Sequence, residues 1–121
     1  MAGWWAACLA LAVLSPTVTV GQVAAPPPEI SYLLNFIATS NCQFYRNGNW
    51  YTSMQAEAHL DEKLALINAS SRVRTAEDFI EKVATKSALT SRPYLVRCTS
   101  GDAVAVNEWL RQELKHHRQA H

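Results

Sequence analysis

Apolar residues recur every three or four positions along four stretches of the chain, and they alternate with polar residues in the segments between them. A spacing of three to four places an apolar stripe on one side of a helix, whereas a spacing of two places side chains alternately on the two faces of a strand. The first helix is predicted to begin at Pro28, which suits a first helical turn, and to end near residues 40–41. Its apolar face comprises Ile30, Leu33, Leu34 and Ile37.

The second helix has a clear start signal. Thr52 or Ser53 is placed to cap it, and Gln55 stands three positions after Thr52, as a capping box requires. The helix is expected to stop around residues 68–71. Its buried stripe is predicted to be Ala56, Leu60, Leu64 and Ile67.

Two further helices follow from the same spacing. Thr75 opens the third, with acidic residues in the first turn, and this helix is expected to end in the polar run before Pro93. The fourth is expected from about Ala103 to His117. Their apolar stripes are Ala76, Phe79, Ile80, Val83 and Ala84 in the third, and Val106, Trp109, Leu110 and Leu114 in the fourth.

Asn47 and Gly48 lie between two runs rich in aromatic residues, and Asn-Gly is the dipeptide that type I′ hairpin turns prefer. A two-residue turn fixes which residues lie opposite one another and therefore which face of the hairpin each occupies. The face that carries Cys42 is expected to be buried. The expected pairs are Arg46 with Asn49, Tyr45 with Trp50, and Phe44 with Tyr51 on the face of Cys42.

Residues 94–98 alternate as one more strand, with Tyr94, Val96 and Cys98 on one face. The predicted order of elements is therefore α-β-β-α-α-β-α. This order describes an α+β domain in which the hairpin and one later strand form a small antiparallel sheet packed with about four helices.

Residues 1–25 are predicted to be an export signal. The apolar run at residues 4–14 has the length of a signal-peptide core and is too short to span a bilayer, which takes about 20 residues. Cleavage is expected after Gly21 or Ala24, with residues 26–121 forming a single domain in the periplasm or outside the cell. No Lys or Arg precedes the run, so retention as a membrane anchor is the alternative.

Cys42 and Cys98 are predicted to form one long-range disulfide. Exported small domains commonly use such bridges, because oxidising compartments let them persist and small cores need the added stability. Catalytic dithiols instead lie close together in Cys-x-x-Cys turns, so a structural role is expected here.

The charge balance argues against a nucleic-acid partner. Eleven Lys and Arg residues stand against ten Asp and Glu, which gives a formal net charge of +1, whereas nucleic-acid-binding domains show a strong basic excess. The chain contains no Gly-rich phosphate loop, His-Glu-x-x-His, Gly-x-Ser-x-Gly or paired-carboxylate motif. No cofactor is therefore expected, and no membrane contact once the signal is removed.

Four cationic or titratable side chains are candidates for a binding site. His59 and Lys63 lie one turn apart on the second helix with Glu62 between them, so they are also the candidates for a general base and a neighbouring cation. If Arg46 and Arg97 converge with them in the fold, the site suits a carboxylate or a phosphate.

Tyr45 and Trp50 form a second candidate binding surface on the other face of the hairpin. Aromatic side chains are enriched at protein interfaces because they bury a large area at small entropic cost. The alternative is that a helix covers them.

His116, His117 and His121 raise the question of a metal site, since His117 and His121 lie one helical turn apart. They lie at the chain terminus without a nearby Cys or carboxylate ligand set. A solvated tail is favoured, and no metal ligand is assigned.

Five short motifs resemble those of a family of small exported bacterial proteins that carries only a domain-of-unknown-function label. The resemblance spans Glu29 to about Leu114. It implies a bacterial, periplasmic location, a single domain, and both cysteines as family positions, and it brings no known activity or partner. It also implies that Arg46, His59 and Lys63 belong to the family pattern. The motifs are Glu29-Ile30-x-Tyr32-Leu33-Leu34, Cys42-x-Phe44-x-Arg46-Asn47-Gly48, His59-Leu60-x-x-Lys63, Ala76-Glu77-Asp78-Phe79-Ile80 and Pro93-Tyr94-x-Val96-Arg97-Cys98.

Together these features favour a non-enzymatic binding or interaction module whose partner is an envelope protein or a small anionic ligand. One alternative is a small periplasmic hydrolase or transferase that uses His59 with Lys63 or Glu62. Another is a weak metal carrier that uses the C-terminal histidines.

Overall fold

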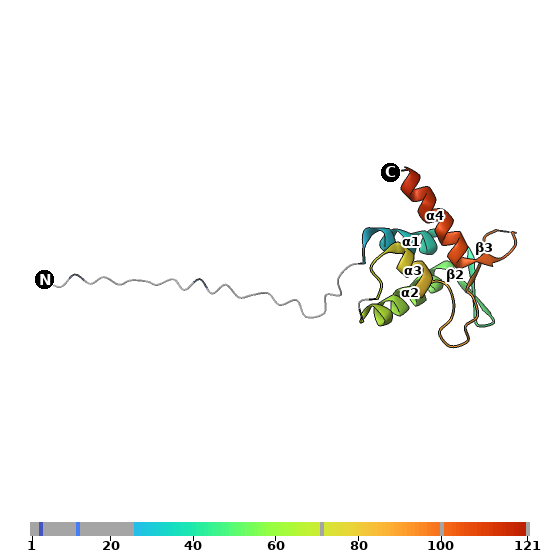
Figure 1. Cartoon of the computed structure of the whole chain (residues 1–121), viewed down its shortest axis with the longest axis horizontal. Coiled ribbons are helices and arrows are strands. Elements are labelled where there is room, and N and C mark those ends of the chain that lie inside the picture. The colour runs from blue at the N-terminus through green and yellow to red at the C-terminus, as the bar shows by residue number, and fades with distance from the viewer. Residues whose placement is uncertain (1–2, 4–11, 13–25, 71, 100, 121) are drawn as a thin grey trace.

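The structure, a computed structural model, describes residues 26–70, 72–99 and 101–120, together with Gly3 and Ala12. The predicted signal segment, residues 1–25, otherwise lies outside the described residues. No helix in this described part is long and apolar enough to cross a membrane. The elements are α1 (Pro28–Thr39), β1 (Gln43–Arg46), β2 (Asn49–Thr52), α2 (Ser53–Asn68), α3 (Ala76–Lys82), β3 (Leu95–Arg97), β4 (Val104–Ala105) and α4 (Val106–Ala120) (Figure 1).

The fold is α+β, as predicted, and its antiparallel sheet has the strand order β2-β1-β3-β4. The predicted hairpin register is confirmed, with Tyr45 opposite Trp50 and Phe44 opposite Tyr51. On the other side of β1, Phe44 lies opposite Val96. Residues directly opposite one another share a face, so Phe44, Tyr51 and Val96 lie on one side of the sheet, and Tyr45 and Trp50 lie on the other.

The prediction of three strands is wrong, because residues 104–105, expected in the last helix, form β4. They pair with Leu95 and Val96 of β3. The amide of Val106 also donates to the carbonyl of Tyr94 at 3.0 Å, so these bonds keep the chain extended up to the residue where α4 begins. A strand of two residues is too short for alternation to be visible in the sequence.

Side-chain caps start α2 and α3 where the sequence predicts them. In the capping box of α2, the Gln55 amide donates to the Thr52 hydroxyl at 3.2 Å, and the Thr52 amide donates to the Gln55 side-chain oxygen at 3.0 Å. In α3, the Asp78 amide donates to the Thr75 hydroxyl at 3.1 Å. These bonds satisfy amides that a helix start otherwise leaves unpaired.

The third helix ends earlier than predicted, at Lys82, although its apolar spacing continues to Ala84. The amides of Val83 and Ala84 both donate to the carbonyl of Phe79, at 2.9 and 3.1 Å, and the helix stops in this turn. Val83 and Ala84 are nevertheless fully buried. The spacing of these two residues therefore indicates that they are buried, and it does not indicate that they are helical. Residues 83–94 form a connecting segment to β3.

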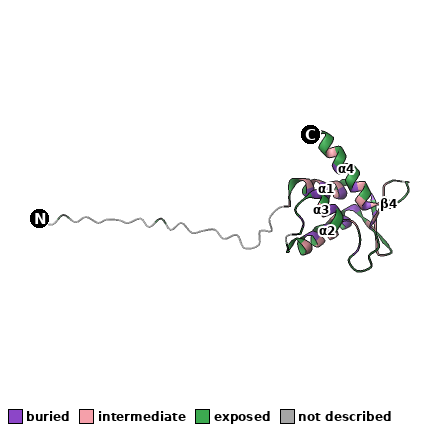
Figure 2. Cartoon of the chain, in the orientation of Figure 1, coloured by how far each residue is buried: buried purple, intermediate pink, exposed green. Residues whose placement is uncertain are grey.

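The core lies where the helices meet one another and one face of the sheet, and Figure 2 shows buried residues on the inner sides of the helices. The predicted stripes supply it, except that Ile67 and Trp109 are only partly buried at its edge. The largest fully buried side chains are Phe79, Ile30, Leu33, Ile37, Ile80, Leu110, Val83, Val96 and Val106.

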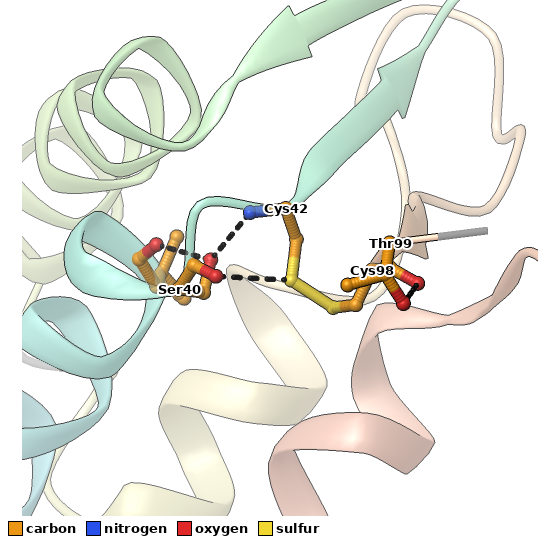
Figure 3. Close-up of a disulfide and its surroundings, with 5 residues drawn as sticks. Ser40, Cys42, Cys98 and Thr99 are labelled. Atoms are coloured by element: carbon orange, nitrogen blue, oxygen red, sulfur yellow. Dashed lines mark hydrogen bonds between the residues drawn. A yellow bond between two sulfur atoms is a disulfide. The ribbon is translucent and has the colours of Figure 1, made fainter. Parts of the chain in front are cut away.

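The predicted disulfide between Cys42 and Cys98 is confirmed (Figure 3). Cys42 precedes β1 and Cys98 follows β3, so the bridge extends the pairing of these strands by one position. Their Cα atoms lie 4.4 Å apart, which matches a close cross-strand pair. The amide of Cys42 also donates to the hydroxyl of Ser40 at 3.3 Å, which ties the end of α1 to the bridge.

We expect the Cys42→Ser/Cys98→Ser double variant to unfold with a free energy lower than that of the wild type by about 2–4 kcal/mol, because the unfolded chain loses its cross-link. Guanidinium denaturation measures this difference. Wild type in reducing agent serves as the control and is expected to match the double variant. Equal unfolding free energies for the oxidised wild type and the double variant would contradict the prediction.

Candidate functional site

A pocket of about 390 Å³ lies between the β1–β2 hairpin and α2. Its volume falls within the range of small-molecule sites. The buried side chains of Phe44, Leu60 and Val106 line it, and we take them as its apolar base. The rest of the lining comes from β1, β2 and α2 and from Tyr94 ahead of β3.

Arg46 extends from the end of β1 toward α2, on the same face as Phe44. Its Nη1 atom lies 2.6 Å from Nδ1 and 3.0 Å from Nε2 of His59. Its Nη2 atom donates to the hydroxyl of Tyr51 at 3.5 Å, and the guanidinium carbon lies 4.9 Å from the centre of that ring. A guanidinium only donates, so His59 accepts from it through an unprotonated ring nitrogen.

Lys63 stands behind this contact and does not line the pocket. Its amine donates to the carbonyl of Lys86 at 2.7 Å and to the hydroxyl of Tyr94 at 3.2 Å. The same hydroxyl lies 3.3 Å from Nε2 of His59. Tyr94 therefore connects Lys63 to His59 in one hydrogen-bonded chain.

The environment lowers the pKa of both basic groups on α2. Burial lowers the pKa of the His59 imidazole, and the cations of Arg46 and Lys63 lower it further, against a smaller opposing effect of Glu62. Burial also lowers the pKa of the Lys63 amine. Burial raises the pKa of the Tyr94 hydroxyl, with Arg46 opposing it, so Tyr94 remains protonated.

Within the described residues, no carboxylate oxygen lies within 4 Å of a side-chain nitrogen of Arg46, His59 or Lys63. Glu62 is the acidic residue that lines the pocket. The four ion pairs of the described part occur elsewhere, on α1, α3 and α4. The pocket thus offers positive charge that no ion pair neutralises.

Arg97 does not join the other three candidates. It stands on the outer face of the sheet, where its guanidinium carbon lies 4.2 Å from the centre of the Trp50 ring and its Nη2 atom donates to Gln43 at 2.8 Å. Tyr45 packs edge-on against Trp50, with ring centres 5.5 Å apart. Trp50 is 38% exposed, and no side chain of this outer cluster is buried. A protein contact through Tyr45 and Trp50 stays a prediction.

Two tyrosines complete the site and were not predicted to take part in it. Tyr51 and Tyr94 fall on the face expected to be buried, where aromatic residues are normally core. The available signal was their hydroxyl group, because a buried tyrosine normally requires a hydrogen-bond partner. That signal indicates polar neighbours without identifying them.

The C-terminal histidines are not gathered into a metal site in the described part of the chain, which contains no group of three His, Cys, Asp or Glu side chains suited to a metal ion. The ring of His117 stacks on Tyr32, with centres 3.7 Å apart. His121 lies outside the described residues, so the metal-carrier alternative stays a prediction.

Comparison with known proteins gives a family without an assigned role. Residues 24–118 match the family of unknown function DUF5329. A curated relative, the uncharacterized protein YfeK of Salmonella typhimurium (strain LT2), is 41% identical over 67 residues, which cover 54% of this chain and 54% of the relative. The chain therefore spans about half the length of that relative. No solved structure matches.

We expect the Arg46→Ala variant to raise the pKa of His59, since a cation that disfavours the imidazolium is removed. Titration of the His59 ring resonances by nuclear magnetic resonance measures this pKa. Arg74→Ala removes an exposed arginine at the start of α3 and is expected to leave the pKa unchanged. An identical His59 pKa in wild type and Arg46→Ala would contradict the geometry described here.

The lowered pKa of His59 in the wild type also makes the stability of the folded protein depend on pH. The unfolded chain binds a proton at His59 more readily than the folded protein does, so the stability that depends on neutral His59 is present above about pH 6.5 and is lost as the pH falls through the lowered pKa. The Arg46→Ala variant is therefore expected to lose less folding stability on acidification than the wild type.

Proposed function

Since the chain belongs to the family of unknown function DUF5329, membership brings no activity with it, and we propose that the protein is a non-enzymatic binding module for a small anion. The pocket between the hairpin and α2 is the binding site. Arg46 and His59 are the residues that contact the anion, and Lys63 adds positive potential from behind Tyr94.

One observation supports this proposal above the others: Arg46 reaches across the pocket to His59, and no carboxylate within the described residues pairs with either. Structural arginines in partly buried positions are normally paired with an acid, because an unpaired buried charge is costly. Among the described residues, the acceptors of the guanidinium are a neutral imidazole and a tyrosine hydroxyl. An anionic ligand would supply the missing partner.

The rival function is a hydrolase or transferase that uses His59 with Lys63 or Glu62. One feature of the pocket supports this rival, because His59 and Glu62 line the pocket together beside Arg46. The described lining residues include no Ser, Thr or Cys to act as a nucleophile, and the Lys63 amine is held by Lys86 and Tyr94. Hydrolysis of 4-nitrophenyl acetate that is lost in His59→Gln would place this rival first.

We also propose that the protein is exported and works in the periplasm. The apolar run at residues 4–14 supports this, and so does the Cys42–Cys98 disulfide, which reducing compartments do not normally permit. Anchoring to the membrane by an uncleaved segment is the alternative form of the same proposal.

Binding of hexanoate tests the proposed site, with hexanamide as a neutral probe of nearly the same shape. We expect hexanoate to bind at least about tenfold more tightly than hexanamide, because only the carboxylate makes charge-assisted bonds to Arg46. Amide shifts in a titration followed by nuclear magnetic resonance measure both affinities and show which residues are perturbed.

Two arginine variants separate the pocket from the outer face in that titration. Arg46→Ala is expected to remove the preference for hexanoate, whereas Arg97→Ala, which deletes the same charge from the other side of the sheet, is expected to preserve it. A preference that survives Arg46→Ala would refute the pocket as the anion site, and one that is lost in Arg97→Ala would assign it to the outer face.

If the protein is exported, cleavage of the signal segment is expected to shorten the chain. Expression of the full-length protein in a Gram-negative host is expected to yield periplasmic material that begins at Gln22 or Ala25, because cleavage is expected after Gly21 or Ala24. Intact-mass spectrometry of the periplasmic fraction measures the mature terminus and the oxidation state of the cysteines together. Full-length protein with free thiols in the cytoplasmic fraction would contradict export.

A further inference from the structure

The pocket has an apolar part and a cationic part. Phe44, Leu60 and Val106 are at least 95% buried and line its base, so an occupant that reaches them must be apolar there. Arg46 and His59 line it as the polar pair described above. A bare inorganic anion would satisfy the polar pair and leave the apolar base without a partner, which points to an organic ligand.

The pocket presents one permanent cation to an anion, and within the described residues no acid forms an ion pair with it. Arg46 is the permanently cationic side chain among the described lining residues, and Glu62 is the acidic one. Lys63 is separated from the pocket by the Tyr94 hydroxyl. A dianion such as phosphate would therefore meet one fixed cation, whereas a monocarboxylate matches that cation in charge and can still accept two bonds from the guanidinium.

In the free protein, Arg46 uses His59 as a hydrogen-bond acceptor, which requires a neutral imidazole. A ligand carboxylate is a stronger acceptor for a guanidinium than an imidazole is. Once the carboxylate takes this place, the His59 nitrogen that accepted from Arg46 is free to bind a proton. The resulting imidazolium then donates to the same carboxylate.

We infer, on the basis of the proposed function, that the ligand is a free monocarboxylic acid anion with an apolar body, and that its carboxylate replaces His59 at Arg46 while His59 takes up one proton. The proton comes from solvent, the carboxylate stays ionised, and no covalent bond is made or broken.

The groups around His59 set the direction of this proton uptake. Burial disfavours the imidazolium in the free protein, and Arg46 and Lys63 act the same way against a smaller opposing effect of Glu62, so the pKa of His59 is lowered before binding. A carboxylate at Arg46 adds a negative charge beside the ring, which favours the imidazolium. The groups that face or adjoin the ring are Arg46 of β1, Tyr51 of β2, Glu62 and Lys63 of α2, and Tyr94 ahead of β3.

A series of straight-chain carboxylates tests the ligand class. From acetate through butanoate to hexanoate, affinity is expected to rise about fourfold for each methylene that reaches the apolar base. Inorganic phosphate is expected to bind no more tightly than acetate. Isothermal titration calorimetry with the full mature chain measures each affinity.

Titrations of hexanoate in Tris and in triethanolamine measure the proton uptake, since these two cationic buffers have different ionisation enthalpies. Near pH 7 we expect a net proton uptake on binding, and an affinity that rises as the pH falls from about 8 to about 6. His59→Gln keeps a neutral polar side chain and is expected to bind hexanoate with no proton uptake. His116→Gln, an exposed position on α4, is the matched control and is expected to retain the uptake.

The outcomes separate the two proposals. Equal affinities for acetate, hexanoate and phosphate, all lost in Arg46→Ala, would overturn the ligand class and keep the anion site. Proton uptake that persists in His59→Gln would overturn the role of His59. Hexanoate binding that is unchanged in Arg46→Ala would overturn the anion site itself.

Discussion

The two-residue turn at Asn47 and Gly48 determines which side chains of the hairpin reach α2. Both residues have positive φ, 49° and 91°, which is the geometry of a type I′ turn and favours Asn and Gly at these positions. This turn fixes the register of the hairpin and so turns Arg46 toward α2. A slip of one residue would exchange the two faces and bring Tyr45 to α2 instead. The disulfide at the other end of β1 ties this strand to β3.

Local chemistry explains how much of the fold the sequence predicts. The Asn-Gly turn, the capping hydroxyl of Thr52 and the apolar stripes each act within a few residues, and the structure confirms them. The two corrections have a different origin. Strand β4 exists because its residues pair with β3, and α3 ends at Lys82 while burial continues to Ala84. The first depends on a partner strand that spacing alone does not identify, and the second shows that apolar spacing follows burial beyond the end of a helix.

The candidate site shows the same division. Arg46, His59 and Lys63 were predicted from the sequence, and the structure brings them together: Arg46 contacts His59, and His59 and Lys63 both contact the Tyr94 hydroxyl. Arg97 was expected to join them only if the fold brought it close, and strand pairing instead turns Arg97 to the outer face of the sheet. Residue type gives charge, whereas the face that a strand residue occupies depends on pairing with other strands. The chemistry was therefore predictable and its assembly was not.

The hairpin register places Arg46 against His59. Nuclear Overhauser contacts of the His59 ring protons in the folded protein test this placement. Contacts are expected from this ring to the Arg46 side chain and to the Tyr94 ring, whose centre lies 6.1 Å away. Contacts from His59 to the rings of Tyr45 or Trp50, with none to Arg46, would show the opposite face of the hairpin on α2 and contradict this placement.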